Sequence, residues 1–190
     1  MRRPRTDRRG FSLVELLVVV AMIGLLSAIV VPRFRVSPAT QVRLAARQLA
    51  QDLEYGRSRA LATRSAARVV FTTVGTLGYT GFLDSDRDGL FLQSVAESDS
   101  LAGFRARPLQ AGIGFGRAGG VPDLPALPGG GSITLPNDRV DFDTRGLTAP
   151  FGVKGVIYLT HADDPTAAAA VSITGAAGIR AWVYHNGSWR

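Results

Sequence analysis

One carboxylate stands alone in the most apolar part of this sequence. Glu15 is the only charged residue between Phe11 and Val31, a run of 21 residues. At about 1.5 Å per residue, a helix of that length spans about 31 Å, close to the hydrocarbon thickness of a bilayer. An acid within such a span costs about 3 kcal/mol on insertion scales, so its presence favours a functional role. We therefore treat Glu15 as a candidate site residue in a predicted membrane helix.

A second group of acids has the spacing of a metal site. Asp84, Asp86 and Asp88 precede Gly89 in the sequence DSDRDG. Alternating carboxylates followed by glycine form the first half of an EF-hand calcium loop, although Val95 stands where the bidentate glutamate belongs. The same residues also suit a hairpin turn. Calcium binding and a plain turn both remain open.

Few residues are suited to catalysis. The chain has no cysteine, two histidines and a single lysine, Lys154, so thiolate chemistry and cysteine metal sites are excluded. We predict ordinary surface positions for His161 and His185. Gly114 to Gly119 spells G-x-G-x-x-G, but no helix follows, so we interpret it as a glycine-rich turn. We predict no enzymatic activity and, apart from calcium, no cofactor.

The N-terminal region divides into a basic peptide and the apolar helix. Residues 1–10 contain five arginines, which account for much of the net charge of +7. Basic residues before an apolar span favour a cytoplasmic N-terminus and an exported C-terminal part. A cleaved secretory signal peptide is the alternative, but no A-x-A site ends the apolar run. A second alternative is a plain membrane anchor that tolerates one acid.

Residues 32–66 are expected to continue as an amphipathic helix. Pro32 predicts a kink or local melting near Ala28 to Pro32, and a helix then runs from about Pro38 to Arg64 with Ser37 as its cap. Apolar or small residues recur at steps of three and four, which predicts one buried face. That face comprises Val42, Ala46, Leu49, Leu53, Gly56 and Ala60.

Residues 67–190 have the pattern of an antiparallel β-domain. Short β-branched or aromatic segments alternate there with glycine, proline and aspartate. The predicted strands are Ala67 to Val74, Leu77 to Leu83, Gly89 to Val95, Ser132 to Leu135, Arg139 to Asp143, Gly155 to His161, Ala169 to Thr174 and Gly178 to Tyr184. Arg117 to Gly131 is predicted to be a long surface loop. The fold class is therefore α+β.

The sequence RRGFSLVELLVV, from Arg8 to Val19, resembles the class III signal of type IV prepilins and type II secretion pseudopilins. The resemblance implies that residues 1–10 are a leader, that a prepilin peptidase cuts between Gly10 and Phe11, and that the Phe11 amine is methylated. Glu15 would then neutralise an N-terminal amine, its own or that of a neighbouring subunit. A buried carboxylate and a buried ammonium are each costly alone and tolerable as a pair.

The C-terminal half is similar to the GspH/FimT group of minor pilins and pseudopilins. The likeness rests on VDFDTRGLTAP from Val140, GVIYL from Gly155, AVSIT from Ala170 and GIR from Gly178. It implies a long N-terminal transmembrane helix packed on a C-terminal antiparallel β-sheet domain. It also implies a subunit at or near the tip of a secretion pseudopilus or type IV pilus.

Partners and location follow from the same resemblance. The expected partners are the peptidase, other pilins through residues 11–31, and the inner membrane, with the C-terminal domain in the periplasm or an extracellular filament. Some members bind DNA through a G-R-x-R ending; here Arg180 matches, while Gly178 replaces the first arginine. Arg180 and Arg190 are therefore candidate DNA contacts, since a few arginines suffice for weak, salt-sensitive binding.

Overall fold

The computed structural model describes residues 11–30, 36–91, 106–125, 127 and 129–190. The chain divides into two compact units, Met1–Val36 and Ser37–Arg190. The predicted leader, which ends at Gly10, and Pro32 lie outside the described residues. The two units are treated separately below.

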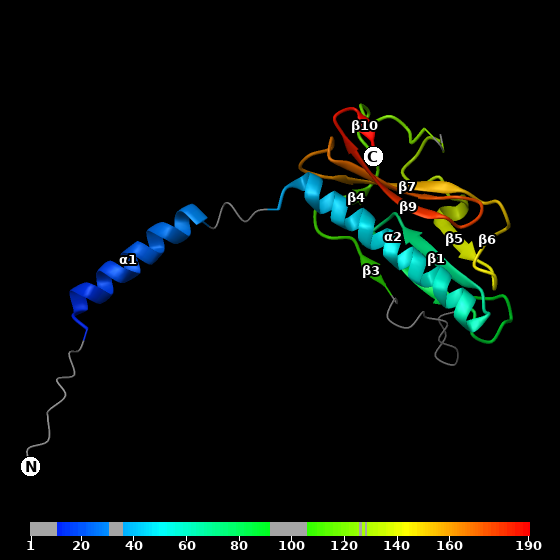
Figure 1. Cartoon of the computed structure of the whole chain (residues 1–190), viewed down its shortest axis with the longest axis horizontal. Coiled ribbons are helices and arrows are strands. Elements are labelled where there is room, and N and C mark those ends of the chain that lie inside the picture. The colour runs from blue at the N-terminus through cyan, green and yellow to red at the C-terminus, as the bar shows by residue number, and fades with distance from the viewer. Residues whose placement is uncertain (1–10, 31–35, 92–105, 126, 128) are drawn as a thin grey trace, which may run out of the picture. The chain divides into compact units, whose positions relative to one another are not determined.

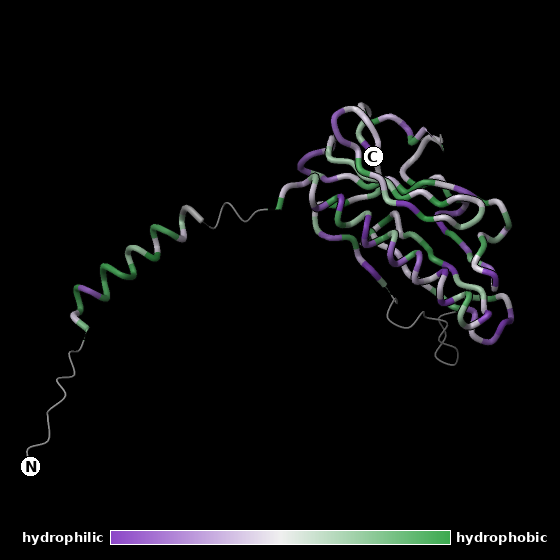
Figure 2. Tube along the Cα trace, viewed as in Figure 1, coloured by the Kyte–Doolittle hydropathy of each residue, from purple (hydrophilic) through white to green (hydrophobic). Residues whose placement is uncertain are grey.

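The described part of the first unit forms the helix α1 (Leu13–Val30). The Ser12 carbonyl accepts the first helical hydrogen bond, from the Leu16 amide at 3.1 Å, and Glu15 lies in the first turn. A carboxylate there is stabilised by the positive end of the helix dipole. Figure 2 shows α1 as hydrophobic over nearly its whole length. Within the described residues, no helix is both long and apolar enough to count as a membrane span. The span predicted over residues 11–31 therefore stays a prediction.

The second unit begins with α2 (Pro38–Thr63), as the sequence predicts. Ser37 caps its first turn by accepting a hydrogen bond from the Thr40 amide at 3.3 Å, and Pro38 fits the first helical position, where no amide donor is needed. The six residues of the predicted stripe are all buried. Asp52 is buried with them, which the sequence does not predict. In Figure 2, α2 alternates between hydrophilic and hydrophobic residues, as an amphipathic helix should.

Two antiparallel sheets follow α2. The first has the strand order β3-β2-β1-β5-β6 and the second β10-β9-β8-β7-β4. The strands are β1 (Ala67–Thr72), β2 (Gly78–Leu83), β3 (Arg107–Pro108), β4 (Ile113–Phe115), β5 (Arg139–Phe142), β6 (Thr148–Ala149), β7 (Gly155–His161), β8 (Ala168–Ile173), β9 (Ile179–His185) and β10 (Ser188–Trp189). A 3₁₀ turn, η2 (Pro136–Asp138), leads into β5. The predicted fold class, a helix with a C-terminal antiparallel β-domain, is confirmed.

The core lies where α2 contacts both sheets (Figure 1). Leu49 and Leu53 of α2 pack in one cluster with Val69, Phe142 and Val171 from the strands. The opposite face of the second sheet is covered as well, by a smaller cluster built around Leu124, Val156, Tyr158 and Ala170. Burial on both faces explains why β7 and β8 are apolar over most of their length, whereas buried positions in β1 alternate with half-buried or exposed ones.

Some strand predictions are wrong or incomplete. Ser132 to Leu135 forms no strand, only an isolated bridge between Ile133 and Ile157. Gly89 to Phe91 is irregular because the preceding acidic loop turns the chain, and the rest of the strand predicted to Val95 lies outside the described residues. The glycine-rich segment at Gly114 is part of β4 rather than only a turn.

Candidate functional site

The N-terminal segment presents an uncovered apolar surface with one acid. Phe11 is 79% exposed, and the large apolar side chains from Leu13 to Leu26 are between 45% and 81% exposed. Glu15 is exposed among them. A helix that is apolar on all sides is stable only when another apolar surface or a membrane covers it. Phe11 and Glu15 therefore lie on a segment that needs a membrane or another protein surface to cover it.

The three aspartates of the predicted calcium loop are brought together. Asp84, Asp86 and Asp88 each offer a carboxylate oxygen within 4.8 Å of the others. Asp84 is buried at the end of β2, whereas Asp86 and Asp88 are exposed. Asp86 accepts a hydrogen bond from the Asp88 amide at 3.3 Å, and Asp88 accepts one from the Leu90 amide at 2.6 Å. The acidic cluster therefore lies in a tight turn, but this turn closes no hairpin, because Gly89 to Phe91 forms no strand.

The two candidate DNA contacts are not brought together. Arg180 lies on β9 with its guanidinium 4.0 Å from the centre of the Trp182 ring. Arg190 exchanges two backbone hydrogen bonds with Val183, at 2.9 and 3.0 Å. Because side chains alternate along a strand and paired residues share a face, Arg190 points to the opposite face of the sheet from Arg180. A nucleic-acid backbone bound to one face of this sheet would therefore contact only one of the two arginines.

A buried polar cluster joins α2 to the first sheet, and the sequence does not predict it. The carboxylate of Asp52 accepts hydrogen bonds from the Tyr79 hydroxyl at 2.8 Å and from Gln48 Nε2 at 3.0 Å. Arg107 Nε lies 3.7 Å from the same carboxylate. Burial raises the pKa of the Tyr79 phenol, and the bond to Asp52 raises it further. The sequence contains one signal for this cluster: Asp52 follows Leu49 by three residues, which places it on the buried face of α2.

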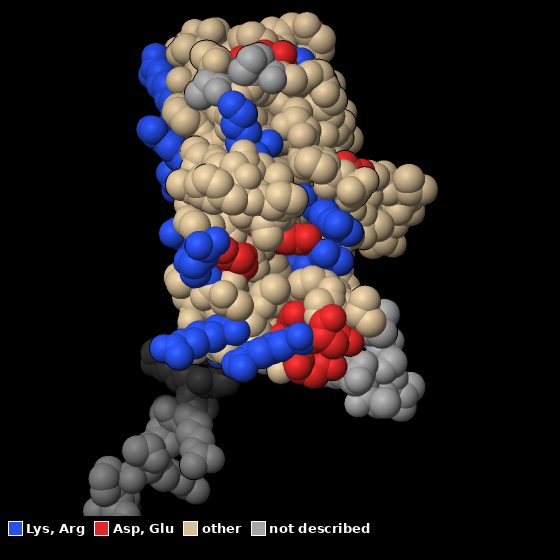
Figure 3. Space-filling view, turned by 90° about the vertical axis from the view of Figure 1, so that its right-hand side faces the viewer, with Lys and Arg blue, Asp and Glu red and all other residues tan. Residues whose placement is uncertain are grey.

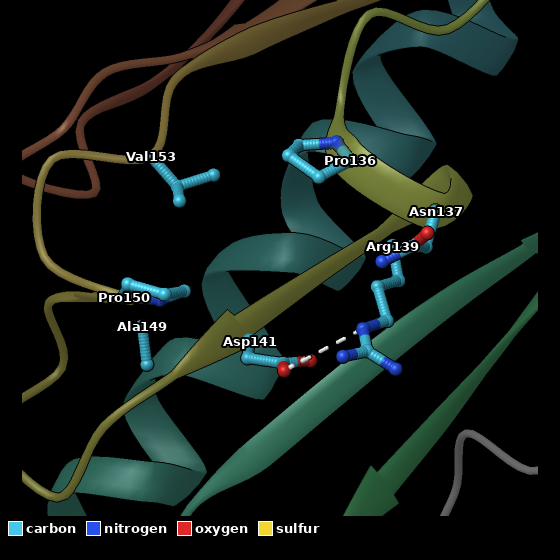
Figure 4. Close-up of a pocket in the computed structure, with 7 residues that line it drawn as sticks. All are labelled: Pro136, Asn137, Arg139, Asp141, Ala149, Pro150 and Val153. Atoms are coloured by element: carbon cyan, nitrogen blue, oxygen red, sulfur yellow. Dashed lines mark ion pairs between the residues drawn. The ribbon is translucent and has the colours of Figure 1, made fainter.

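A surface pocket of about 290 Å³ lies beside β5 and β6 (Figure 4). Its only acid, Asp141, is already paired: Arg68 binds it through two nitrogens at 2.7 and 2.8 Å, and Arg139 lies 3.7 Å away. The oxygens of Asp141 are thus used in ion pairs within the sheet. The pocket is otherwise lined by Pro136, Asn137, Ala149, Pro150 and Val153.

The histidines show no catalytic partner among the described residues. His185 is exposed, as predicted, but His161 is buried, so the surface prediction is wrong for it. The ring of His161 packs against Gly112, where an added Cβ would lie 2.8 Å from Nε2, and Nδ1 accepts a hydrogen bond from the Asp163 amide at 3.1 Å. His161 is therefore a packed structural residue of β7.

Comparison with known proteins identifies the N-terminal segment. Residues 5–31 match the model of the prokaryotic N-terminal methylation motif. This match includes Gly10, Phe11 and Glu15. No curated protein matches the chain significantly.

The chain is also similar to solved structures. The type IV minor pilin FimU of Pseudomonas aeruginosa is similar at 13% identity and a TM-score of 0.50, over 80% of this chain and 93% of that one. The minor pseudopilin EpsH from the type 2 secretion system of Vibrio cholerae matches at 14% identity and a TM-score of 0.48. That match covers 78% of this chain and 98% of EpsH. The chain thus carries the prokaryotic N-terminal methylation motif, and its fold is similar to that of a type IV minor pilin.

Proposed function

We propose that this protein is a structural subunit of a type IV pilus or a type II secretion pseudopilus, and not an enzyme. The observation that carries the proposal is α1: an uncovered apolar helix with one acid, Glu15, inside a methylation motif. Such a helix is stable in a membrane and later against the helices of other subunits. Residues 11–31 would form a single pass of the inner membrane, with residues 37–190 outside the cytoplasm.

The proposal includes processing by a prepilin peptidase. Cleavage between Gly10 and Phe11 removes the basic leader and leaves Phe11 as the new N-terminus, which is then methylated. Intact-mass spectrometry of the mature protein tests this step. We expect the mass of residues 11–190 plus one methyl group, and a Gly10→Val variant should retain its leader. An uncut wild-type protein, or a cut after residue 31, would refute the processing step.

Glu15 has a specific role in this scheme. It follows Phe11 by four residues, which corresponds to about 6 Å along a helix, so its carboxylate can pair with the free amine of the same chain or of a neighbour. Within a membrane or a packed bundle, pairing removes two charges that are each costly alone. The amine exists only after cleavage, so the pair can form only in processed subunits.

Charge removal at Glu15 tests the pairing. Glu15→Gln keeps the side-chain shape, and Glu15→Leu adds apolar surface. We expect both variants to enter the membrane normally and to be depleted in sheared filaments, as quantified by immunoblot. Glu54→Gln, on a half-buried position of α2, is the matched control and should assemble like the wild type. Normal incorporation of Glu15→Gln would contradict the pairing.

The proposal further assigns the subunit to the tip of the filament, as a minor component. The β-domain buries its own core against α2, so the subunit has a complete fold before it joins a filament. Immunogold labelling of filaments tests this position. Gold confined to filament ends supports it, and labelling along the shaft would contradict it.

DNA binding is a second candidate, favoured by one observation, the exposed Arg180 stacked on Trp182. An arginine beside an aromatic ring can hold a phosphate while the ring stacks on a base. Figure 3, however, shows basic side chains in several separated groups on the face it displays, with acidic ones between them. Retardation of double-stranded DNA across a salt series decides this. Arg180→Ala should weaken binding and Arg190→Ala should not; no retardation near physiological salt would remove the candidate.

A further inference from the structure

The loop after β2 folds back on itself and holds its three acids close together. The Asp84 amide donates to the Ala66 carbonyl at 2.8 Å, which fixes the start of the loop beside β1. Arg87 and Gly89 have φ values of 65° and 80°, so the chain reverses within a few residues. As a result, one carboxylate oxygen from each of Asp84, Asp86 and Asp88 lies within 4.8 Å of the other two. Figure 3 shows a compact group of acidic side chains on the side of the molecule that faces the viewer.

Asp84 carries an oxygen without a partner. The residue is only 5% exposed. Its Oδ2 accepts a hydrogen bond from the Gly89 amide at 3.2 Å, whereas its buried Oδ1 has no hydrogen-bond partner in the described part of the chain. A buried carboxylate oxygen left unsatisfied is costly.

The arginine inside the loop does not neutralise these acids. Arg87 directs its guanidinium to the Thr63 carbonyl at the end of α2, at a distance of 3.3 Å. Among the described residues it forms no ion pair with any of the three aspartates. The loop therefore gathers three carboxylates, one of which has a buried, unsatisfied oxygen, while the cation of the loop attaches it to α2.

We propose that Asp84, Asp86 and Asp88 bind one calcium ion. Hard divalent cations take oxygen ligands, and the set contains no nitrogen or sulfur donor that would favour zinc or copper. Calcium–oxygen bonds of about 2.3–2.6 Å allow two ligands of one ion to lie up to about 5 Å apart, which accommodates the observed spacing. Water and backbone carbonyls complete the coordination. The ion satisfies the buried oxygen of Asp84 and cancels the repulsion among the carboxylates.

Bound calcium would stiffen the junction between β2 and α2. The loop is attached to β1 through the Asp84 amide and to α2 through Arg87, so an ion at its centre links three elements. Extracellular calcium modules often bind with dissociation constants of about 0.1–1 mM, which suits a domain outside the cytoplasm. The proposal concerns only these residues and does not depend on the pilus assignment.

Calorimetry and thermal unfolding of the full chain in detergent micelles test the proposal. After treatment with a chelator, titration with CaCl₂ at constant ionic strength should give one site per chain. At about ten times the dissociation constant, the melting temperature should rise by about 4 °C for a domain of this size. The rise with MgCl₂ should be smaller, because magnesium demands shorter bonds and a stricter octahedral geometry.

Variants separate calcium binding from general charge effects. Asp86→Asn and Asp88→Asn keep the oxygen that accepts the backbone hydrogen bond, so both should fold, melt at or above the wild-type temperature without calcium, and lose most of the calcium response. Asp163→Asn, whose side chain is 86% exposed outside the loop, should respond like the wild type. No binding at about 5 mM calcium, a full response in Asp86→Asn, or equal responses to magnesium and calcium would overturn the proposal.

Discussion

The hydroxyl of Tyr79 offers a direct test of what holds α2 on the first sheet. Tyr79→Phe removes one hydrogen bond to the Asp52 carboxylate, at 2.8 Å, between residues that are only 5% and 7% exposed. Hydrogen bonds to charged groups contribute about 1.5–3 kcal/mol. Gln48 and Arg107 still reach the carboxylate, so the loss should be partly compensated. We expect the free energy of unfolding to fall by about 2 kcal/mol.

Urea unfolding of residues 37–190, followed by circular dichroism, measures this loss. At a slope of about 2 kcal/mol per molar urea, the midpoint should fall by about 1 M. Phenylalanine keeps the ring contact with Phe71, whose centroid lies 6.2 Å away, so packing should change little. Tyr184→Phe is the matched control, because no hydrogen bond of its hydroxyl is seen in the described part of the chain. A loss below about 0.5 kcal/mol, or an equal loss in both variants, would refute the reasoning.

The same pair predicts a pH dependence with a definite sign. The pKa of Tyr79 is raised in the folded state by burial and by Asp52, while in the unfolded chain it returns to about 10. The stabilisation is therefore fully present below about pH 10 and is lost as the pH rises toward the folded-state pKa. By pH 11 the advantage of the wild type over Tyr79→Phe should shrink by about 1.4 kcal/mol. A constant difference between pH 7 and pH 11 would contradict this.

Three further changes test the core, a turn and a cross-strand pair by urea unfolding of the same fragment. Leu49→Ala empties a fully buried position and should cost about 3 kcal/mol; a loss under about 1 kcal/mol would contradict its placement. Gly146→Ala should cost about 1–2 kcal/mol, because φ is +70° and the added Cβ would lie 2.7 Å from Leu61 Cγ; an unchanged midpoint would contradict that geometry. Arg68→Lys should cost about 1 kcal/mol, since lysine cannot bind Asp141 through two nitrogens, and a neutral result would mean that the paired geometry contributes nothing.

Local patterns in the sequence were sufficient for much of the fold. The three- and four-residue steps from Val42 to Ala60 identified the buried face of α2, because helix periodicity alone determines it. Ser37 and Pro38 identified the start of α2, where Ser37 accepts a hydrogen bond from the Thr40 amide. The runs at β7 and β8 were recognisable because both faces of that sheet are buried.

The parts that the sequence did not predict depend on distant partners. The two-residue strands β3 and β6 have no periodicity of their own and exist only because β2 and β5 pair with them. The Asp52 cluster could be predicted only with the knowledge that Tyr79 contacts α2. The sheet faces on which Arg180 and Arg190 lie could be predicted only from the pairing of β9 with the last residues of the chain. The acidic loop was predictable as a cluster because its members are only two residues apart.

The two helices differ in how much apolar surface they leave exposed. This difference supports the proposal that subunits associate through α1. The apolar stripe of α2 is fully used within residues 37–190, where Leu49 and Leu53 have no exposure. On its outer side α2 exposes only three large apolar side chains, Leu44, Tyr55 and Leu61, at 41–49%, so it offers less apolar area for further association than α1 does. The described side chains of α1 keep most of their apolar area uncovered. Because the hydrophobic effect scales with the area removed from water, association between subunits should be concentrated on α1, with Glu15 as the polar group that sets its register.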